Sequence, residues 1–174
     1  AAADLVNSCQ DTFVVWVNTN YESDELIPLI PDAVEVRGSE SIAEKERKLL
    51  AFTNGERRAI ICKPSMFGYG LNWQHCHRMV FVGLDYSFEN FYQAIRRCYR
   101  FGQTQPVEVT IIAANTEAPL ITAIERKVRD HQRMSESMNN TARLSLAEGR
   151  HLSRYNPQLP MILPDWLQER YYAA

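Results

Sequence analysis

The chain has few cysteines, almost no net charge and no long apolar segment. Its formal net charge is -2 over 174 residues, so the composition does not indicate a nucleic-acid-binding protein, and any basic surface has to be local. No apolar run approaches the roughly 20 residues that span a bilayer. The N-terminal residues lack the basic-then-apolar layout of a secretory signal. We therefore expect an intracellular, cytoplasmic protein that makes no contact with a membrane.

The four cysteines show no paired spacing, so reduced and mostly buried thiols are expected. A zinc site needs about four ligands, usually from two separated pairs. His75-Cys76-His77 is one tight cluster with no matching second pair. The acidic pair Asp24-Glu25 falls on a predicted helix and does not follow an apolar strand, so we interpret it as solvent-facing. The sequence therefore predicts no metal site.

Glycine is scarce as well, and its placement excludes two kinds of nucleotide site. None of the seven glycines lies in a Gly-x-x-x-x-Gly-Lys-Ser/Thr loop, so the chain does not cradle a triphosphate in that way. Gly68-x-Gly70 lacks the third glycine of the dinucleotide-binding fingerprint, and the strand before it is not the first. A dinucleotide-binding domain is therefore the weakest interpretation.

Short apolar runs alternate with helical patterns along most of the chain. Runs rich in β-branched and aromatic residues predict five strands, at 12–17, 33–36, 58–63, 79–84 and 106–113. Helical patterns lie between them, the second opening with the capping-box spacing of Ser41 and Glu44 and ending at Asn54-Gly55. Because strands separated by helices require right-handed crossovers, we predict an α/β domain with a mainly parallel sheet and helices on both faces.

Periodic apolar residues predict which helix faces turn inward. For the helix that Ser87 caps, these are Phe88, Phe91, Tyr92, Ile95, Cys98 and Tyr99; for the helix after Ser41, they are Ile42, Leu49, Leu50 and Thr53. A long helical pattern follows Thr116 and runs to Met138. From about Asn139 the pattern decays, with a candidate helix at 141–150 and three prolines further on. We predict a lobe at 1–138 and an irregular or helical extension at 139–174 that packs on it.

The segment from Gln93 to Gln103 carries three arginines within five residues. Arg97 and Arg100 are three residues apart, so a helix would place them on one face. Guanidinium groups stay charged and bind phosphate oxygens in a bidentate manner, which suits them to stabilising a phosphoryl group during transfer. An exposed basic helix with carboxylate partners explains the same segment about equally well.

Two further segments follow predicted strands. Lys63 to Trp73 contains Gly68 and Gly70, which allow close backbone approach, while Lys63 and Ser65 offer groups for a phosphate. An ordinary strand-to-helix turn explains this segment equally well. Arg37-Gly38-Ser39 is explained by a turn at Gly38 and a helix cap at Ser39 or Ser41.

Taken in order, these segments resemble the C-terminal RecA-like helicase lobe of superfamily 2. The resemblance is strongest to the Swi/Snf-type branch, including related helicases of phages and mobile elements. The segment from Gln93 to Gln103 is similar to that branch's sixth motif, and Ser65 to Asn72 to its fifth. Arg37-Gly38-Ser39 and the strand at 12–17 are similar to two further elements, so the resemblance spans about 12–138.

The resemblance implies a role for each matching residue. Arg97 and Arg100 match arginines that reach ATP held by the other lobe, and Gln93 matches a glutamine that couples that site to motion. Those beside the nucleotide are Gly68, Gly70 and Asn72, and those on elements touching the nucleic-acid backbone are Ser39, Lys63 and Ser65. ATP and Mg²⁺ are then bound mainly by the N-terminal RecA-like lobe of the same polypeptide, and none is held by this chain alone.

The resemblance also has limits, and it leaves two functional hypotheses. Arg96 and Tyr99 replace the usual acidic residue and histidine of the sixth motif, and Pro64 interrupts the fifth. The first hypothesis is the second motor lobe of an ATP-dependent DNA helicase or translocase, monomeric and acting on the backbone of duplex DNA. The alternative is a non-enzymatic, helicase-like docking module within a larger complex.

Overall fold

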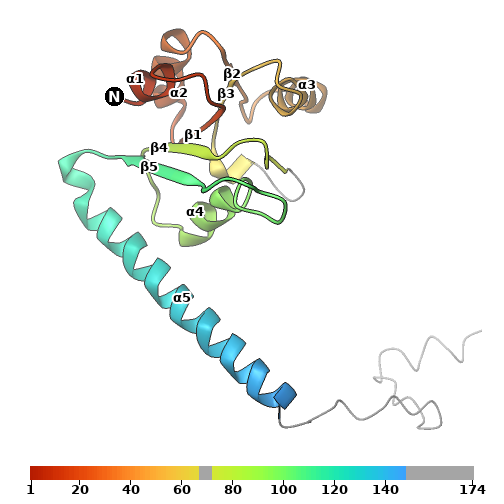
Figure 1. The fold of residues 1–174 in the computed structure, drawn as a ribbon. Helices are drawn as coiled ribbons and strands as arrows, with labels where there is room; N and C mark the ends of the chain where they lie inside the picture. The colour runs from red at the N-terminus through yellow and green to blue at the C-terminus, as the bar shows by residue number, and fades with distance from the viewer. Residues whose placement is uncertain (67–71, 148–174) are drawn as a thin grey trace, which may run out of the picture. The chain divides into compact units, whose positions relative to one another are not determined.

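The computed structural model describes residues 1–66 and 72–147. Five strands form one sheet in the order β2-β3-β1-β4-β5, and every neighbouring pair is parallel (Figure 1). The strands are β1 (Phe13–Val17), β2 (Ala33–Glu35), β3 (Ala59–Cys62), β4 (Arg78–Val82) and β5 (Glu108–Ile112). The predicted α/β fold with a parallel sheet is confirmed.

Helices connect the strands, with short 3-10 turns at three of the connections. The helical elements are α1 (Ala2–Asn7), α2 (Asn20–Leu26), η1 (Ile27–Leu29), α3 (Ile42–Thr53), η2 (Pro64–Met66), α4 (Phe88–Ile95), η3 (Asn115–Glu117) and α5 (Ala118–Ala147). The predicted caps are confirmed, because the hydroxyls of Ser41 and Ser87 accept hydrogen bonds from backbone N–H groups in the first turns of α3 and α4.

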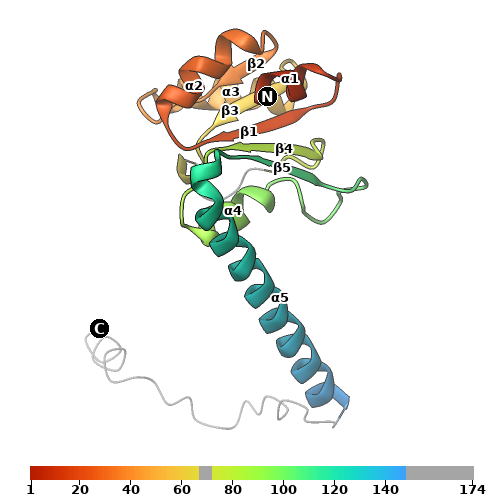
Figure 2. The same cartoon turned by 90° about the vertical axis from the view of Figure 1, so that its left-hand side faces the viewer.

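Two apolar clusters pack on the sheet, and Figures 1 and 2 show the helices that flank it. On one face, α1 and α2 contribute Val6 and Leu26 to a core with Val15 of β1. On the other face, Phe52 of α3 and Phe91 of α4 enter the core that also holds the first turns of α5. The crossover through α2 moves away from the sheet centre and those through α3 and α4 move the opposite way, which places them on opposite faces.

The chain divides into two compact units, 1–130 and 131–174. In the first unit, Leu120 and Ile124 of α5 are buried in the core. The helix continues without a break through position 139, where the sequence pattern decays, and it ends at Ala147. Positions 148–174 lie outside the described residues, so the extension at 139–174 and its packing on a lobe at 1–138 stay predictions.

Several predicted inward positions are wrong. Ile42 is 84% exposed and Leu50 is 50% exposed, whereas Phe52 is fully buried and anchors α3. Tyr99 is 58% exposed. The helical period misplaces it because α4 ends at Ile95 and the chain then turns.

Arg97 and Arg100 consequently lie after the helix and not on it, contrary to the prediction. The N–H groups of Arg97 and Cys98 bond to carbonyls three residues earlier, which tightens the chain into turns. Cys98 is fully buried, so the chain turns toward the core at this point. The carbonyl of Arg97 accepts a hydrogen bond from the N–H of Trp73 and does not continue the helical ladder.

Candidate functional site

Three neighbouring strands end together at the carboxyl edge of the sheet. The chain runs from β1 to the edge strand β2, back to β3 and then across to β4, so the strand order reverses around β1. Open parallel sheets bind ligands at such a position. A narrow hollow of about 20 Å³ lies there, and its polar lining consists of Asn18, Lys63, Ser65, Asp85 and Asn90. It holds roughly one water molecule, so its polar groups serve a surface contact better than an enclosed ligand.

Carboxylates fix the loops around this hollow. Glu22 Oε2 accepts a hydrogen bond from the backbone N–H of Asn18 at 2.6 Å. Gly83 has a φ of +73°, and a Cβ at this position would lie 2.7 Å from Glu22 Oε1, so the loop after β4 needs glycine twice over. Asp85 Oδ2 accepts a hydrogen bond from the side-chain amide of Asn90 at 2.9 Å. These hydrogen bonds therefore hold the loops that line the first hollow in place.

The arginine-bearing turn after α4 is bound to the loop that precedes β4. The backbone N–H of Trp73 donates to the carbonyl of Arg97 at 2.9 Å. The side-chain amide of Gln103 donates to the backbone carbonyls of Gln74 and Cys76, each at 3.0 Å. These bonds fix the backbone from which the arginine side chains project.

A second hollow, of about 370 Å³, opens beside this turn. Five side chains line it: Tyr92, Gln93, Arg96, Arg97 and Arg100. Arg97 is only 9% exposed, and its pKa is lowered by burial and then by the positive charge of Arg100. Burial raises the pKa of the Cys62 thiol at the end of β3, and the positive charge of Arg97 acts against that rise.

No carboxylate of the described residues lines this second hollow. Arg100 is also absent from the ion pairs found within 1–66 and 72–147. Three guanidinium groups therefore border one open space, and an anion such as a phosphate group matches their charge and donor geometry. This is the arrangement that phosphoryl transfer requires of a charge-stabilising group.

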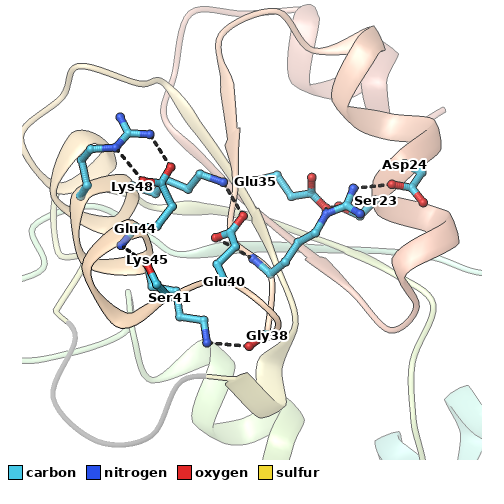
Figure 3. Close-up of polar contacts among 11 residues, drawn as sticks. Ser23, Asp24, Glu35, Gly38, Glu40, Ser41, Glu44, Lys45 and Lys48 are labelled. Atoms are coloured by element: carbon cyan, nitrogen blue, oxygen red, sulfur yellow. Dashed lines mark hydrogen bonds and ion pairs between the residues drawn. The ribbon is translucent and has the colours of Figure 1, made fainter.

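A second arginine-bearing segment, the loop after β2, is organised in the opposite way (Figure 3). Arg37 Nε forms an ion pair with Glu35 at 2.6 Å, and its Nη2 pairs with Asp24 of α2. These two carboxylates raise the pKa of Arg37 through hydrogen bonds. Ser23, which is buried, donates its hydroxyl hydrogen to Glu35 Oε1. Figure 3 shows how this cluster joins α2, the end of β2 and the loop.

The far end of the same loop is tied to α3. Glu40 pairs with Lys48 at 2.5 Å and also accepts a hydrogen bond from the backbone N–H of Arg37 at 3.2 Å. Lys45 Nζ donates to the carbonyl of Gly38 at 2.7 Å, as Figure 3 also shows. The turn at Gly38 and Ser39 is thereby held with both residues exposed.

The fold and the order of these loops can now be compared with known families. The model of the helicase conserved C-terminal domain matches residues 3–102, which is more than half of the chain. The chain belongs to this helicase family. It is a RecA-like C-terminal lobe of superfamily 2. A search of curated proteins finds no match.

Solved structures share the fold at low sequence identity. The C-terminal part of the Fun30 ATPase domain aligns with a TM-score of 0.60 and 15% identity, over 68% of this lobe and 41% of that chain. The C-terminal domain of the DEAD-box protein Dbp5 gives 0.65 and 16%, over 74% and 77%. S. cerevisiae Dbp5 bound to RNA and ADP BeF3 gives 0.62 and 15%, over 72% and 34%. The helicase lobe thus spans less than half of the Fun30 chain.

The predicted site residues of the helicase lobe fall into separate groups. Gln93, Arg97 and Arg100 share the second hollow, and Lys63 and Ser65 share the first. Asn72 is exposed and directly precedes Trp73, which is bonded to the arginine turn. Ser39 is exposed at the tip of the loop after β2 and lines neither hollow. Gly68 and Gly70 lie outside the described residues.

Sequence reasoning missed several residues of these sites. Asn18, Asp85 and Asn90 line the first hollow. Asp85 directly follows a predicted strand, so its position was a usable signal, whereas the contact of Asn18 depends on the strand order. The pairing of Asp24 with Arg37 was also missed, although Asp24 is exposed as predicted. Nothing in the sequence spacing links α2 to the loop after β2.

Among the described residues, no group of three or more His, Cys, Asp or Glu side chains is placed to hold a metal ion. His75 lies against the ring of Phe52, and Cys76 Sγ lies 3.2 Å from the carbonyl oxygens of Thr12 and Arg78. Among the described helices, none has the length and apolar character required to cross a bilayer.

Proposed function

We propose that this lobe is the second half of an ATP-dependent DNA motor of the Swi/Snf-type branch, acting as a helicase or translocase. In this proposal, Arg97 and Arg100 are arginine fingers. They contact the phosphates of ATP held by the N-terminal RecA-like lobe of the same polypeptide, and Gln93 couples that contact to movement of the lobes. Gly68, Gly70 and Asn72 lie beside the nucleotide when the two lobes close.

One observation carries the proposal. Gln93, Arg97 and Arg100 border one hollow, and no carboxylate of the described residues lines that hollow. Guanidinium groups supply donors to phosphate oxygens, and the described residues contain no cluster of metal ligands. This donor set fits a nucleotide whose Mg²⁺ is held mainly by the partner lobe. A metal ion bound there would neutralise charge on the phosphates.

Nucleic acid is assigned to the other edge residues. Ser39 is exposed on a loop held by charged side chains, and Lys63 and Ser65 border the first hollow. Such polar and basic groups suit contacts to backbone phosphates, which position a protein with little reading of sequence. The choice of duplex DNA rests on the resemblance to the Swi/Snf-type branch, including the Arg-x-Gly-Gln ending of the segment at 100–103. The neighbours do not support a phage or mobile-element origin, and we do not propose one.

The decisive experiment measures DNA-stimulated ATP hydrolysis by the full-length protein. Arg97→Ala and Arg100→Ala should each lower kcat by about a thousandfold, because an arginine finger stabilises charge that develops only in the transition state. Arg129→Ala is the matched control, because Arg129 is an exposed arginine paired with Glu125 on α5, and it should leave kcat unchanged. Turnover that survives both finger substitutions would remove the assignment.

The docking-module alternative makes a different prediction about the parent protein. A motor requires a phosphate-binding loop in the polypeptide before this lobe, and a docking module does not. The isolated lobe should be monomeric and hydrolyse no ATP under either hypothesis. Translating the gene upstream of Ala1 therefore separates the two, because the absence of such a loop would favour the docking module.

A further inference from the structure

Phe101 is the most exposed of the large apolar side chains that the structure describes, at 97%. The phenylalanines elsewhere in residues 1–66 and 72–147 are buried or partly buried, namely Phe13, Phe52, Phe81, Phe88 and Phe91. Exposed tyrosines also occur, but a tyrosine hydroxyl forms hydrogen bonds with water, whereas a phenyl ring has no polar group. A single exposed apolar side chain is common on protein surfaces, so the backbone around Phe101 decides whether its ring is displayed on purpose.

The backbone that carries this ring is fixed on both sides. The side-chain amide of Gln74 donates a hydrogen bond to the Phe101 carbonyl at 2.5 Å. Gly102 has a φ of +95°, and a Cβ at that position would lie 3.3 Å from the same amide nitrogen, so the turn requires glycine. The N–H of Gln103 donates to the carbonyl of Arg100 at 3.0 Å. The ring therefore projects into solvent from a hydrogen-bonded turn and not from a loose loop.

Polar residues flank Phe101 along the chain. Arg100 precedes it, and the residues at 102–105 that follow are glycine, glutamine or threonine. Interfaces between proteins are commonly built in this way, with an aromatic ring buried at the centre and polar residues at the rim. The binding partner that fits is therefore a protein surface with an apolar pocket and a polar border.

The position of Phe101 indicates which protein surface this is. Arg100 lines the second hollow, and in the proposed function that hollow faces the N-terminal RecA-like lobe. Phe101 directly follows Arg100 but does not line that hollow. It also does not line the first hollow, where Lys63 and Ser65 are assigned to nucleic acid. A ring next to the arginines, but outside the space for the phosphates, is placed to contact the lobe that holds the nucleotide.

We infer that Phe101 forms a contact between the two lobes, in which its ring enters an apolar pocket of the N-terminal RecA-like lobe when the lobes close. The inference rests on the proposed function and extends it, because the contact is with protein and not with the nucleotide. Burial of the ring stabilises the closed arrangement through the hydrophobic effect. Since Phe101 adjoins Arg100 on a fixed turn, the contact also positions the arginine side chains against ATP. Phe101 is thus a positioning residue and takes no part in phosphoryl transfer.

The first test is photo-crosslinking of the full-length protein with p-benzoylphenylalanine in place of Phe101. This photoreactive residue links to C–H groups that its ring system contacts. Irradiation in the presence of duplex DNA and a non-hydrolysable ATP analogue should join position 101 to a peptide of the N-terminal lobe, which mass spectrometry identifies. Leu29 is the matched position, because it is 57% exposed and lies on η1, after α2 and on the other face of the sheet from α4. The same replacement at Leu29 should give no such peptide.

The second test measures DNA-stimulated ATP hydrolysis by the full-length protein. Phe101→Ala should lower kcat/KM for ATP by about tenfold, as expected when one aromatic ring is no longer buried in the closed state. Phe101→Leu keeps an apolar side chain and should retain most of the activity, and Leu29→Ala should match the wild type. Near-ultraviolet circular dichroism without nucleotide should be the same for all variants, because the Phe101 ring is exposed in this lobe.

Four outcomes overturn the inference. The ring contacts nucleic acid if position 101 crosslinks to the DNA, and it contacts a second copy of the protein if it crosslinks to this same lobe of another molecule. Absence of any crosslink to the N-terminal lobe removes the contact, and unchanged ATP hydrolysis in Phe101→Ala removes the positioning role. The proposed function fails separately, because turnover that survives Arg97→Ala and Arg100→Ala removes the fingers even when position 101 crosslinks to the N-terminal lobe.

Discussion

Two segments of the lobe carry arginines in opposite environments. Arg37, after β2, contacts two carboxylates, Glu35 and Asp24. Arg97 and Arg100, after α4, border a hollow that no carboxylate of the described residues lines. Arg37 therefore has carboxylate partners within the lobe, and the loop after β2 has a structural role. Arg97 and Arg100 border an open space, which suits the binding of an anion.

The two environments indicate different roles for the arginines of this lobe. A guanidinium that already has carboxylate partners gains little from a phosphate, because binding would first have to replace those partners. A guanidinium without them gains a full charge-assisted hydrogen bond. The segment at 96–100, which follows α4, clusters three arginines around one hollow.

The largest effect on stability should come from removing a carboxylate from the ion-pair cluster around Arg37. Glu35→Ala removes the partner of the buried Ser23 hydroxyl as well as one partner of Arg37. A buried donor left without an acceptor is costly, so the free energy of unfolding should fall by about 2 kcal/mol, measured by urea denaturation. Asp24→Ala is the control, because Asp24 is 55% exposed and contacts only Arg37 in this cluster, and its effect should be much smaller. Equal losses of stability in Glu35→Ala and Asp24→Ala would contradict the structural role of the loop after β2.

A smaller effect should come from adding a carboxylate to the second hollow. Gln93→Glu adds a carboxylate to the hollow that holds Arg97 and Arg100. The new ion pairs should compete with phosphate, so the affinity for tripolyphosphate, measured by calorimetric titration, should fall by about tenfold, while stability should rise by about 0.5 kcal/mol at most. Gln93→Ala, which adds no charge, should retain most of the affinity. Unchanged tripolyphosphate binding in Gln93→Glu would show that the anion binds elsewhere.

The sequence was sufficient to predict the sheet but not the course of the arginine segment. Runs such as 13–17 are buried on every residue, so their strand character is visible without tertiary information. The turn after Ile95 depends on contacts from another part of the chain, including the bond from the Trp73 N–H to the Arg97 carbonyl. No local pattern reports such a bond, and the helical period therefore ran on to Tyr99.

The candidate site was only partly predictable for the same reason. The grouping of Gln93, Arg97 and Arg100 follows from one short segment, and the structure brings these residues together even though the helix ends early. The pairing of Arg37 with Asp24 joins the loop after β2 to α2, 13 residues earlier in the chain, and it depends on where β2 lies in the sheet. Local segments were therefore predictable from their composition, while contacts between segments required the strand order.

The smallest effect concerns acid sensitivity on the paired side of the comparison. Glu44 of α3 accepts hydrogen bonds from the guanidinium of Arg47 at 2.7 and 3.2 Å, and these bonds lower the pKa of Glu44 below its ordinary value of 4.5. The unfolded chain therefore binds more protons at Glu44 as the pH falls through this range. The stabilising contribution is fully present above the ordinary pKa and is lost as the pH falls through the lowered one.

Glu44→Gln should accordingly make the free energy of unfolding slightly less dependent on pH between about 5 and 3, the range in which such carboxylates titrate. Glu46→Gln is the matched control, because Glu46 is an exposed glutamate of the same helix that joins none of the ion pairs found among the described residues. Urea denaturation at a series of pH values measures both. Because Ser41 caps the backbone N–H of residue 44, the substitution leaves the helix start intact. If the pH profile of stability were identical for Glu44→Gln and Glu46→Gln, the pair with Arg47 would contribute nothing to stability. Only carboxylates with buried partners, such as Glu35, would then stabilise this side of the lobe.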